Sequence, residues 1–129
     1  MCSVNEQNET RGKIVKVEEI QKRLQLQVSV GARGLVQEVA GGYSGDLLSD
    51  VMANASKGAL WLTVQSHPNI VAVAVLRELA GIILVNGRQP DEETRTRAED
   101  EGIPLLLSPL SSFQLAGKLY ELGIGRASV

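Results

Sequence analysis

The residues of this chain that could take part in chemistry gather in short polar segments between apolar runs. His67 is the only histidine, and it lies in the polar segment 65–69. A histidine acts as a general acid or base only when a second group orients its ring. Asp46 and Asp50, four residues apart, could share one helical face and form half of a metal site or orient His67. Aspartate also caps helices, and this role is the simpler alternative for Asp46.

The known catalytic motifs are absent from the sequence. The glycine-rich stretch GGYSG, residues 41–45, fits neither G-x-x-x-x-G-K-[ST] nor G-x-G-x-x-G. No G-x-S-x-G motif occurs, and no paired cysteines or histidines have metal-ligand spacing. The single cysteine, Cys2, can form neither an internal disulfide nor a Cys-rich metal site. We therefore expect no catalytic residues, no metal and no cofactor, and a protein that is not an enzyme.

Composition narrows the class of protein further. The 129 residues are 43% hydrophobic and only 3% aromatic, which predicts one domain with an aliphatic core. The formal net charge of -2, with both signs spread along the chain, argues against nucleic acid as a partner. No signal peptide and no bilayer-spanning apolar run is evident, so the expectation is a cytoplasmic protein without a membrane partner. We expect Trp61 in the core or at a dimer interface.

Apolar periodicity predicts strands and helices in alternation. The runs ALWLTV (59–64), GIILVNG (81–87) and PLLLS (104–108) are typical of strands buried on both faces. Helical patterns follow over 46–56, 69–80, 90–102 and 111–123. Nearer the N-terminus, the spacing predicts a helix over 17–26 and a strand around 35–39 that ends at the Gly41–Gly42 break.

Several local contacts can be predicted from spacing. Ser44 or Asp46 is expected to cap the helix over 46–56. The pair Ser111 and Gln114 has capping-box spacing at the start of the last helix. In the charged helix over 90–102, Asp91 with Arg95 and Glu93 with Arg97 are spaced for weak surface ion pairs.

Three successive strand-then-helix units with short connections predict an α/β fold. The sheet is expected to be mainly parallel, with helices on both faces. We place a single domain over residues 12–125, between a flexible N-terminal tail (1–11) and a C-terminal tail (126–129).

Polar segments follow each predicted strand. In open α/β sheets, ligands bind beyond the carboxyl ends of the strands, where helix starts favour anions. We expect backbone N–H groups, hydroxyls and Arg88 to hold an anion there, while Gln65 and Asn69 fix its orientation. The candidate ligand-binding residues are Ser44, Asp46, Gln65, His67, Asn69, Asn86, Arg88 and Ser111.

Four blocks of the sequence carry a resemblance to a known family. They are GDLLSDVM, LTVQSHPNIVAVAVL, IILVNGRQPDEET and EGIPLLLSPLSSFQLAGKLYELGI. With them, residues 13–124 resemble the DRTGG domain family and, more distantly, the N-terminal domain of HPr kinase/phosphorylase. The five letters that name the family do not occur as a string in this chain.

The resemblance implies a fold related to the N-terminal domains of HPr kinase and of Mur ligases. It also implies a regulatory or accessory domain of the kind joined to CBS pairs or to phosphotransacetylase. The kinase activity of HPr kinase belongs to a separate P-loop domain, whose motif this chain lacks. The resemblance carries over no catalytic residue, and it implies a homodimer and a redox or metabolic protein as a partner.

The leading hypothesis is a non-catalytic regulatory domain that binds a small anionic ligand, such as a nucleotide, or a partner protein at these loops. One alternative is a small hydrolase or lyase that uses His67 and Asp46. A second alternative is a structural subunit of a redox or hydrogenase-associated complex.

Overall fold

The computed structural model describes residues 14–125, so the predicted tails 1–11 and 126–129 lie outside the described residues. The elements are α2 (Val17–Arg23), β1 (Gln27–Val30), the 3₁₀ helix η1 (Ala32–Val36), β2 (Gly41–Ser44), α3 (Leu48–Asn54), β3 (Ala59–Thr63), α4 (Asn69–Leu76), β4 (Gly81–Leu84), α5 (Glu92–Glu101), β5 (Leu105–Leu107) and α6 (Ser112–Glu121). The strands form one sheet in the order β1-β5-β4-β3-β2. Strands β2 to β5 are parallel, whereas β1 pairs antiparallel with β5. The predicted α/β fold with a mainly parallel sheet is confirmed.

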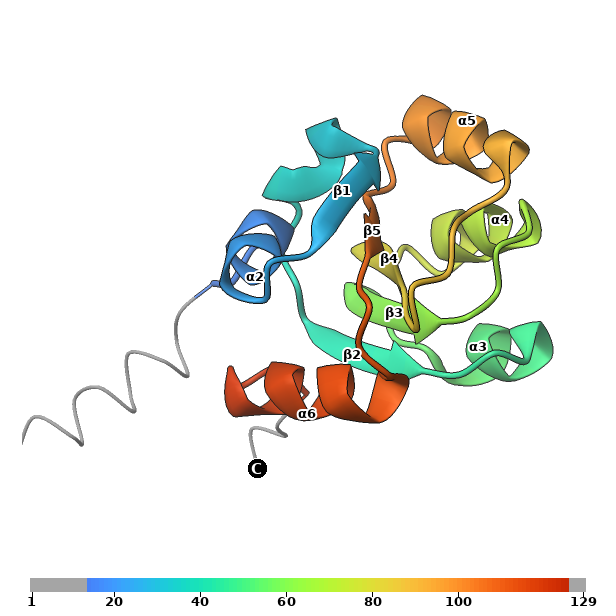
Figure 1. Cartoon of the computed structure of the whole chain (residues 1–129). Helices are drawn as coiled ribbons and strands as arrows, with labels where there is room; N and C mark the ends of the chain where they lie inside the picture. Colours follow the sequence, from blue (N-terminus) through green and yellow to red (C-terminus); the bar gives the residue numbers. More distant parts are fainter. Residues whose placement is uncertain (1–13, 126–129) are drawn as a thin grey trace, which may run out of the picture.

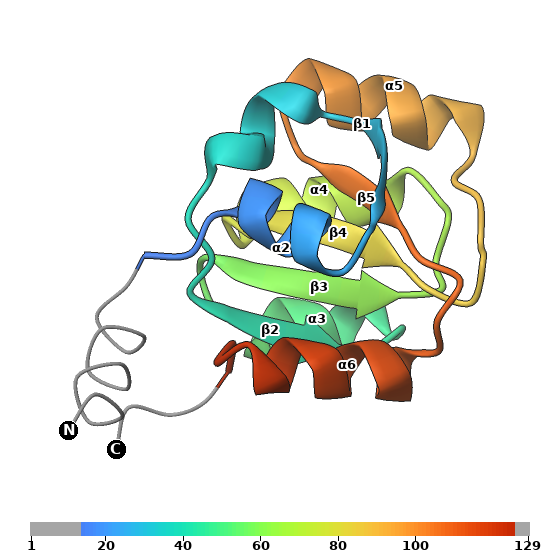
Figure 2. The ribbon, with the colours of Figure 1, turned by 60° about the vertical axis from the view of Figure 1, so that its left-hand side comes forward.

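Helices cover both faces of the sheet, as Figures 1 and 2 show. Side chains alternate between the faces of a strand, so β3 contributes to two separate cores. Trp61 packs with α3, α4 and α5 on one face, whereas Leu60 and Leu62 pack with α2 and α6 on the other. Trp61 is fully buried, which confirms a place in the core. Both cores are otherwise almost entirely aliphatic, as the composition predicts.

The N-terminal part differs from the sequence prediction. The strand expected around 35–39 is wrong: the 3₁₀ helix Ala32–Val36 stands there, and β2 begins at Gly41 instead of ending there. The helix expected over 17–26 ends at Arg23, and the chain then turns at Gln25, whose φ of 55° is left-handed. Strand β1 follows at once, so the predicted helix is present but three residues shorter, and the edge strand β1 and the 3₁₀ helix stand before the strand that begins at Gly41.

Gly31 explains why η1 lies where it does. It has a φ of 81°, and an added Cβ would lie 2.0 Å from the carbonyl oxygen of Ile103. Its backbone N–H donates to a carboxylate oxygen of Glu99 on α5, at 2.8 Å. Only glycine tolerates both the left-handed backbone and this close approach. The turn after β1 is therefore pressed against the segment that enters β5.

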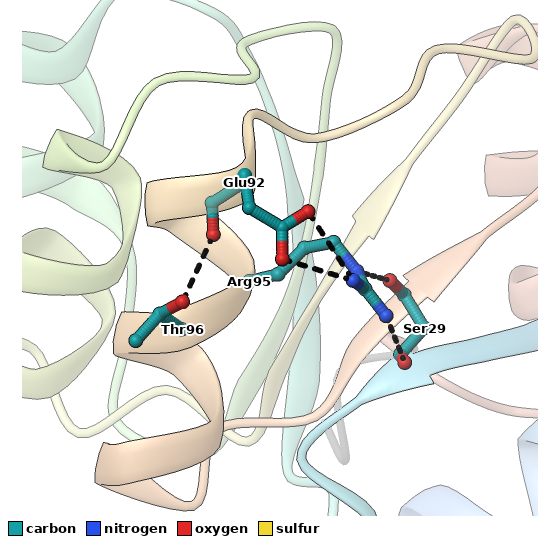
Figure 3. A network of polar contacts seen from close by, with 4 residues as sticks. All are labelled: Ser29, Glu92, Arg95 and Thr96. Carbon is teal, nitrogen blue, oxygen red and sulfur yellow. Dashed lines mark hydrogen bonds and ion pairs between the residues drawn. The ribbon is translucent and has the colours of Figure 1, made fainter.

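Arg95 on α5 forms hydrogen bonds to the edge strand β1 (Figure 3). Its guanidinium donates to the hydroxyl of Ser29 at 3.1 Å and to the carbonyl of Ser29 at 3.4 Å. It also lies 3.4 Å from the carboxylate of Glu92. The predicted pair of Asp91 with Arg95 is therefore wrong, because the guanidinium turns toward the sheet edge. The predicted surface pair of Glu93 with Arg97 is confirmed at 3.1 Å.

Candidate functional site

The parallel register gathers four loops at one edge of the sheet. Tyr43 is in register with Trp61, and Leu84 is in register with both Thr63 and Leu107. Since parallel strands end at the same side of a sheet, the loops 45–47, 64–68, 85–91 and 108–111 follow β2, β3, β4 and β5 there (Figure 2). We call this set of four loops the loop edge.

Asp46 ties the loop after β2 to the end of β3. Its Oδ1 accepts hydrogen bonds from the hydroxyl of Thr63 at 2.8 Å and from the backbone N–H of Val64 at 2.9 Å. The side-chain amide of Gln65 donates to the backbone carbonyl of Asp46, also at 2.9 Å. Thr63 is fully buried, and a buried hydroxyl needs a partner. Asp46 therefore supplies that partner and fixes the path of the chain beyond β3.

The predicted cap of helix α3 is wrong. The N-cap residue is Leu47, which offers no side-chain oxygen, and no side-chain cap is formed. Asp46 uses its carboxylate across the sheet instead, and Ser44 is the last residue of strand β2. The predicted capping box at the other end of the loop edge is confirmed: Ser111 Oγ accepts from the backbone N–H of Gln114 at 3.2 Å.

The carbonyl of Ser66 joins the loop after β3 to the start of α5. It accepts from the backbone N–H of Asp91 at 3.1 Å and from the hydroxyl of Thr94 at 2.6 Å. Thr94 is fully buried. The loops that follow β3 and β4 are therefore held side by side.

Backbone hydrogen bonds make a second link, between the loops after β4 and β5. The N–H of Asn86 donates to the carbonyl of Leu110 at 2.8 Å, and that of Gly87 donates to the carbonyl of Ser108 at 3.0 Å. Asn86 has a left-handed φ of 59°, which asparagine tolerates better than most residues. The loop edge is thus a connected surface, and each loop in it is fixed to a neighbour.

Besides Ser44 and Asp46, four predicted site residues are exposed: His67, Asn69, Asn86 and Arg88. Within residues 14–125, none of their side chains forms a hydrogen bond or an ion pair. His67 lies in the loop after β3, Asn69 is the first residue of α4, and Asn86 and Arg88 lie in the loop after the neighbouring strand β4. One guanidinium, one imidazole and two side-chain amides are therefore available to a ligand.

The other predicted site residues have different surroundings. Asp46, Gln65 and Ser111 are engaged in the contacts described above. Ser44 lines a cavity of about 220 Å³ between β2 and α6, together with Leu62 and Ala116.

The carboxylates that could orient His67 have other partners. Asp46 binds Thr63 and Val64, whereas Asp50 accepts from the hydroxyl of Tyr43 at 2.5 Å and from the amide of Asn54 at 2.9 Å. In the part of the chain that the structure describes, no three His, Cys, Asp or Glu residues come together to hold a metal. The geometry therefore supplies neither an oriented base nor a metal centre.

The contact with Asp50 also changes the chemistry of Tyr43. The hydrogen bond to the Asp50 carboxylate raises the pKa of the Tyr43 hydroxyl above its ordinary value near 10, with smaller contributions from burial and from charge repulsion by Asp50. A phenol held neutral in this way is a structural donor, not a nucleophile.

Sequence reasoning missed two cavities that lie away from the loop edge. One, of about 580 Å³, lies between α4 and the strand-entry side of the sheet, and it includes Ala40, Leu79 and Ile103. The other, of about 530 Å³, lies between α4 and α5. The signal was present in the sequence: α4 is NIVAVAVL, apolar on every side, and such a helix leaves an apolar face beyond the one that covers the sheet.

Across residues 14–125, every helix is too short or too polar to cross a lipid bilayer.

Comparisons with known proteins support the fold. No protein-family profile matches the chain. No curated protein matches it either. A solved structure of the CBS and DRTGG domains of the regulatory region of a pyrophosphatase from Clostridium perfringens, complexed with its activator diadenosine tetraphosphate, matches with a TM-score of 0.65 at 15% identity. The match covers 95% of this chain and 57% of that one. At this identity the likeness shows a shared fold, and it supports the DRTGG-like α/β fold that the sequence resemblance implies.

Proposed function

We propose that this protein is a non-catalytic regulatory domain that binds a small anionic ligand of the nucleotide class at the loop edge. The observation that carries the proposal is a group of exposed, unpaired side chains on two neighbouring loops and at the start of α4: His67, Asn69, Asn86 and Arg88. Exposed polar side chains on loops that a rigid scaffold fixes in place are typical of binding sites.

The chemistry of these side chains suits a phosphate-bearing ligand. The Arg88 guanidinium can donate two parallel hydrogen bonds to phosphate oxygens. The imidazole of His67 can donate a hydrogen bond whether it is neutral or charged. The side-chain amides of Asn69 and Asn86 can both donate to and accept from the polar groups of a base or sugar.

The remaining candidate residues support the binding groups. Asp46 and Gln65 hold the loop that carries His67, and Ser111 fixes the start of α6 beside it. Ser44 has the smallest part in the proposal, because it lines the separate cavity beside α6.

The Clostridium perfringens structure supports the choice of a nucleotide as the first ligand class to test. That structure contains a regulatory region with an activator made of adenosine and phosphate groups. For this chain we propose the same general role: the ligand shifts the population of two conformations, in a homodimer, and a metabolic or redox protein responds to that shift. The hydrolase or lyase alternative needs a carboxylate that orients the ring of His67, whereas Asp46 and Asp50 are bound to other groups.

Thermal unfolding monitored by Trp61 fluorescence tests the proposal. The indole N–H of Trp61 donates to the carbonyl of Gly45 at 2.8 Å, so the single tryptophan reports on the loop edge as well as on the core. The probes are diadenosine tetraphosphate, ATP, AMP and inorganic phosphate. A ligand present at a hundred times its dissociation constant should add about 2.7 kcal/mol to the free energy of unfolding.

Two substitutions make the test specific. Arg88→Ala should abolish the stabilisation by the ligand. Arg23→Ala is the matched control, since Arg23 is also exposed and has no partner within residues 14–125. Absence of a shift with every probe, or equal losses in the two variants, would reject the proposal and favour the structural-subunit alternative.

A further inference from the structure

An apolar groove on the α4–α5 side of the molecule has no role in the proposed function. The cavities of about 580 and 530 Å³ meet at Val75 and Glu101, which line both. We call the combined surface the α4–α5 groove. Its base includes the exposed side chains Val75 and Leu76, which are 40% and 68% exposed. Figure 1 shows α4 and α5 side by side, and they cover the face of the sheet opposite to α6.

The rim of the groove has an excess of negative charge. Two basic residues border it, and each is already paired: Lys57 with Glu78 at 3.1 Å, and Arg97 with Glu93 at 3.1 Å. The remaining rim carboxylates are Glu38, Asp100 and Glu101, and within the described residues none of their side chains has a cationic or hydrogen-bonding partner.

The backbone adds to this charge. Helix α4 ends at Leu76 and α5 ends at Glu101, so the C-terminal ends of both helices lie at the groove. The C-terminus of a helix carries a partial negative charge and favours cations. Arg33 offsets part of the partial negative charge at the end of α5, since its guanidinium donates to the carbonyls of Glu99 at 3.0 Å and Asp100 at 2.7 Å. These two hydrogen bonds are to backbone, and Arg33 forms no ion pair with the carboxylates of Asp100 or Glu101.

We infer that the α4–α5 groove is a docking surface for a partner protein that presents a basic amphipathic helix. An apolar face on such a helix would cover Val75 and Leu76, and lysine or arginine at its borders would pair with Asp100 and Glu101. A second copy of this chain is a poorer occupant, because a two-fold contact would place the same unpaired carboxylates against each other. The docking surface is separate from the loop edge, so it stands whether or not a nucleotide binds there.

The test measures binding of a fluorescein-labelled amphipathic peptide of leucine and lysine, by fluorescence anisotropy with the full chain. The comparison peptides are the same sequence with glutamate in place of lysine, and a scrambled leucine–lysine sequence without an apolar face. We expect the basic amphipathic peptide alone to bind, and its affinity to fall as salt is added. Equal binding of the scrambled peptide would overturn the inference.

Matched variants locate the site. Leu76→Ser should weaken binding about tenfold, whereas Leu47→Ser, at a leucine that is also 68% exposed, should leave it unchanged. Glu101→Gln should weaken binding about two- to fivefold, and Glu121→Gln should not; these residues are the last of α5 and α6.

Equal effects of target and control variants would overturn the inference. Sedimentation of the free chain tests whether a second copy occupies the groove instead. A dimer that Leu76→Ser dissociates would assign the groove to that second copy and overturn the inference.

Discussion

Residues 14–40 and residues 41–125 are attached to the same sheet by different physical means. The second region repeats strand and helix, and it is held by aliphatic side chains that are fully buried on both faces, such as Ile82 on one face and Ile83 on the other. The first region also packs α2 on the sheet through the buried Val17 and Ile20. Its antiparallel edge strand and 3₁₀ helix depend in addition on the close backbone approach at Gly31 and on directed hydrogen bonds from Arg95. Aliphatic packing tolerates small changes of shape, whereas a close backbone contact does not.

The largest effect that this comparison predicts is at Gly31. Gly31→Ala forces an alanine into a left-handed backbone and places its methyl group against the carbonyl of Ile103. We expect it to lower the free energy of unfolding by about 4 kcal/mol, as measured by urea denaturation.

Gly117→Ala is the matched control for Gly31→Ala. Gly117 lies within α6, and a Cβ added there meets nothing within 4 Å. We expect a gain of about 0.5–1 kcal/mol from helix propensity. A small effect of Gly31→Ala would mean that the first region adapts as readily as the second.

A conservative substitution in the aliphatic core should cost much less. Ile83→Val removes one methylene from a residue that is fully buried in the core beneath α2 and α6. We expect a loss of about 1 kcal/mol by the same measurement. The comparison fails if removing this methylene costs more than adding a methyl at Gly31.

The directed contact on β1 should have an effect of similar or smaller size. Arg95→Lys keeps the charge but loses the planar fork that reaches the hydroxyl and the carbonyl of Ser29. We expect a loss of about 0.5–1 kcal/mol, with faster amide hydrogen exchange confined to β1. Arg97→Lys is the control, because its exposed pair with Glu93 contributes little. Unchanged exchange in β1 would show that Arg95 does not hold the edge.

The smallest effect concerns the polar contact in the first unit of the repeat. The pKa of Tyr43 is raised in the folded protein, mainly by its hydrogen bond to Asp50. The stabilisation from this contact is therefore fully present below the unfolded pKa near 10, and it is lost as pH rises through the higher folded pKa. Absorbance at 295 nm should show a lower Tyr43 midpoint in Asp50→Asn than in the parent, both carrying Tyr120→Phe. Equal midpoints would contradict the assigned cause.

The fold of residues 41–125 could be predicted from the sequence better than that of residues 14–40. Strands β3, β4 and β5 are buried on both faces, so each leaves a continuous apolar run that is easy to recognise. Strand β1 is a partly exposed edge strand, QVSV, whose partner lies far along the chain. Neither feature leaves a local pattern, and the helical spacing of the preceding residues extends into it.

The candidate site was predictable in position and less so in detail. The loop edge follows from the parallel strands alone, and the exposed side chains of His67 and Arg88 lie there. Asp46 was misassigned because a carboxylate before a helix is usually a cap, whereas the buried hydroxyl of Thr63 captures it here. The exposure of Leu76 could not be predicted, since sequence periodicity does not show which side of an all-apolar helix lacks a neighbour.

The pairing of β1 with β5 has a consequence for protein synthesis. Val30 is in register with Leu105, 75 residues later. At a translation rate of about 5–20 residues per second, β1 exists for about 4–15 s before its hydrogen-bonding partner has been made. During that time the backbone donors and acceptors of β1 must remain in water or find a substitute. The nascent chain therefore offers an open strand, and ribosome-bound chaperones are best placed to shield it until the last strand–helix unit emerges.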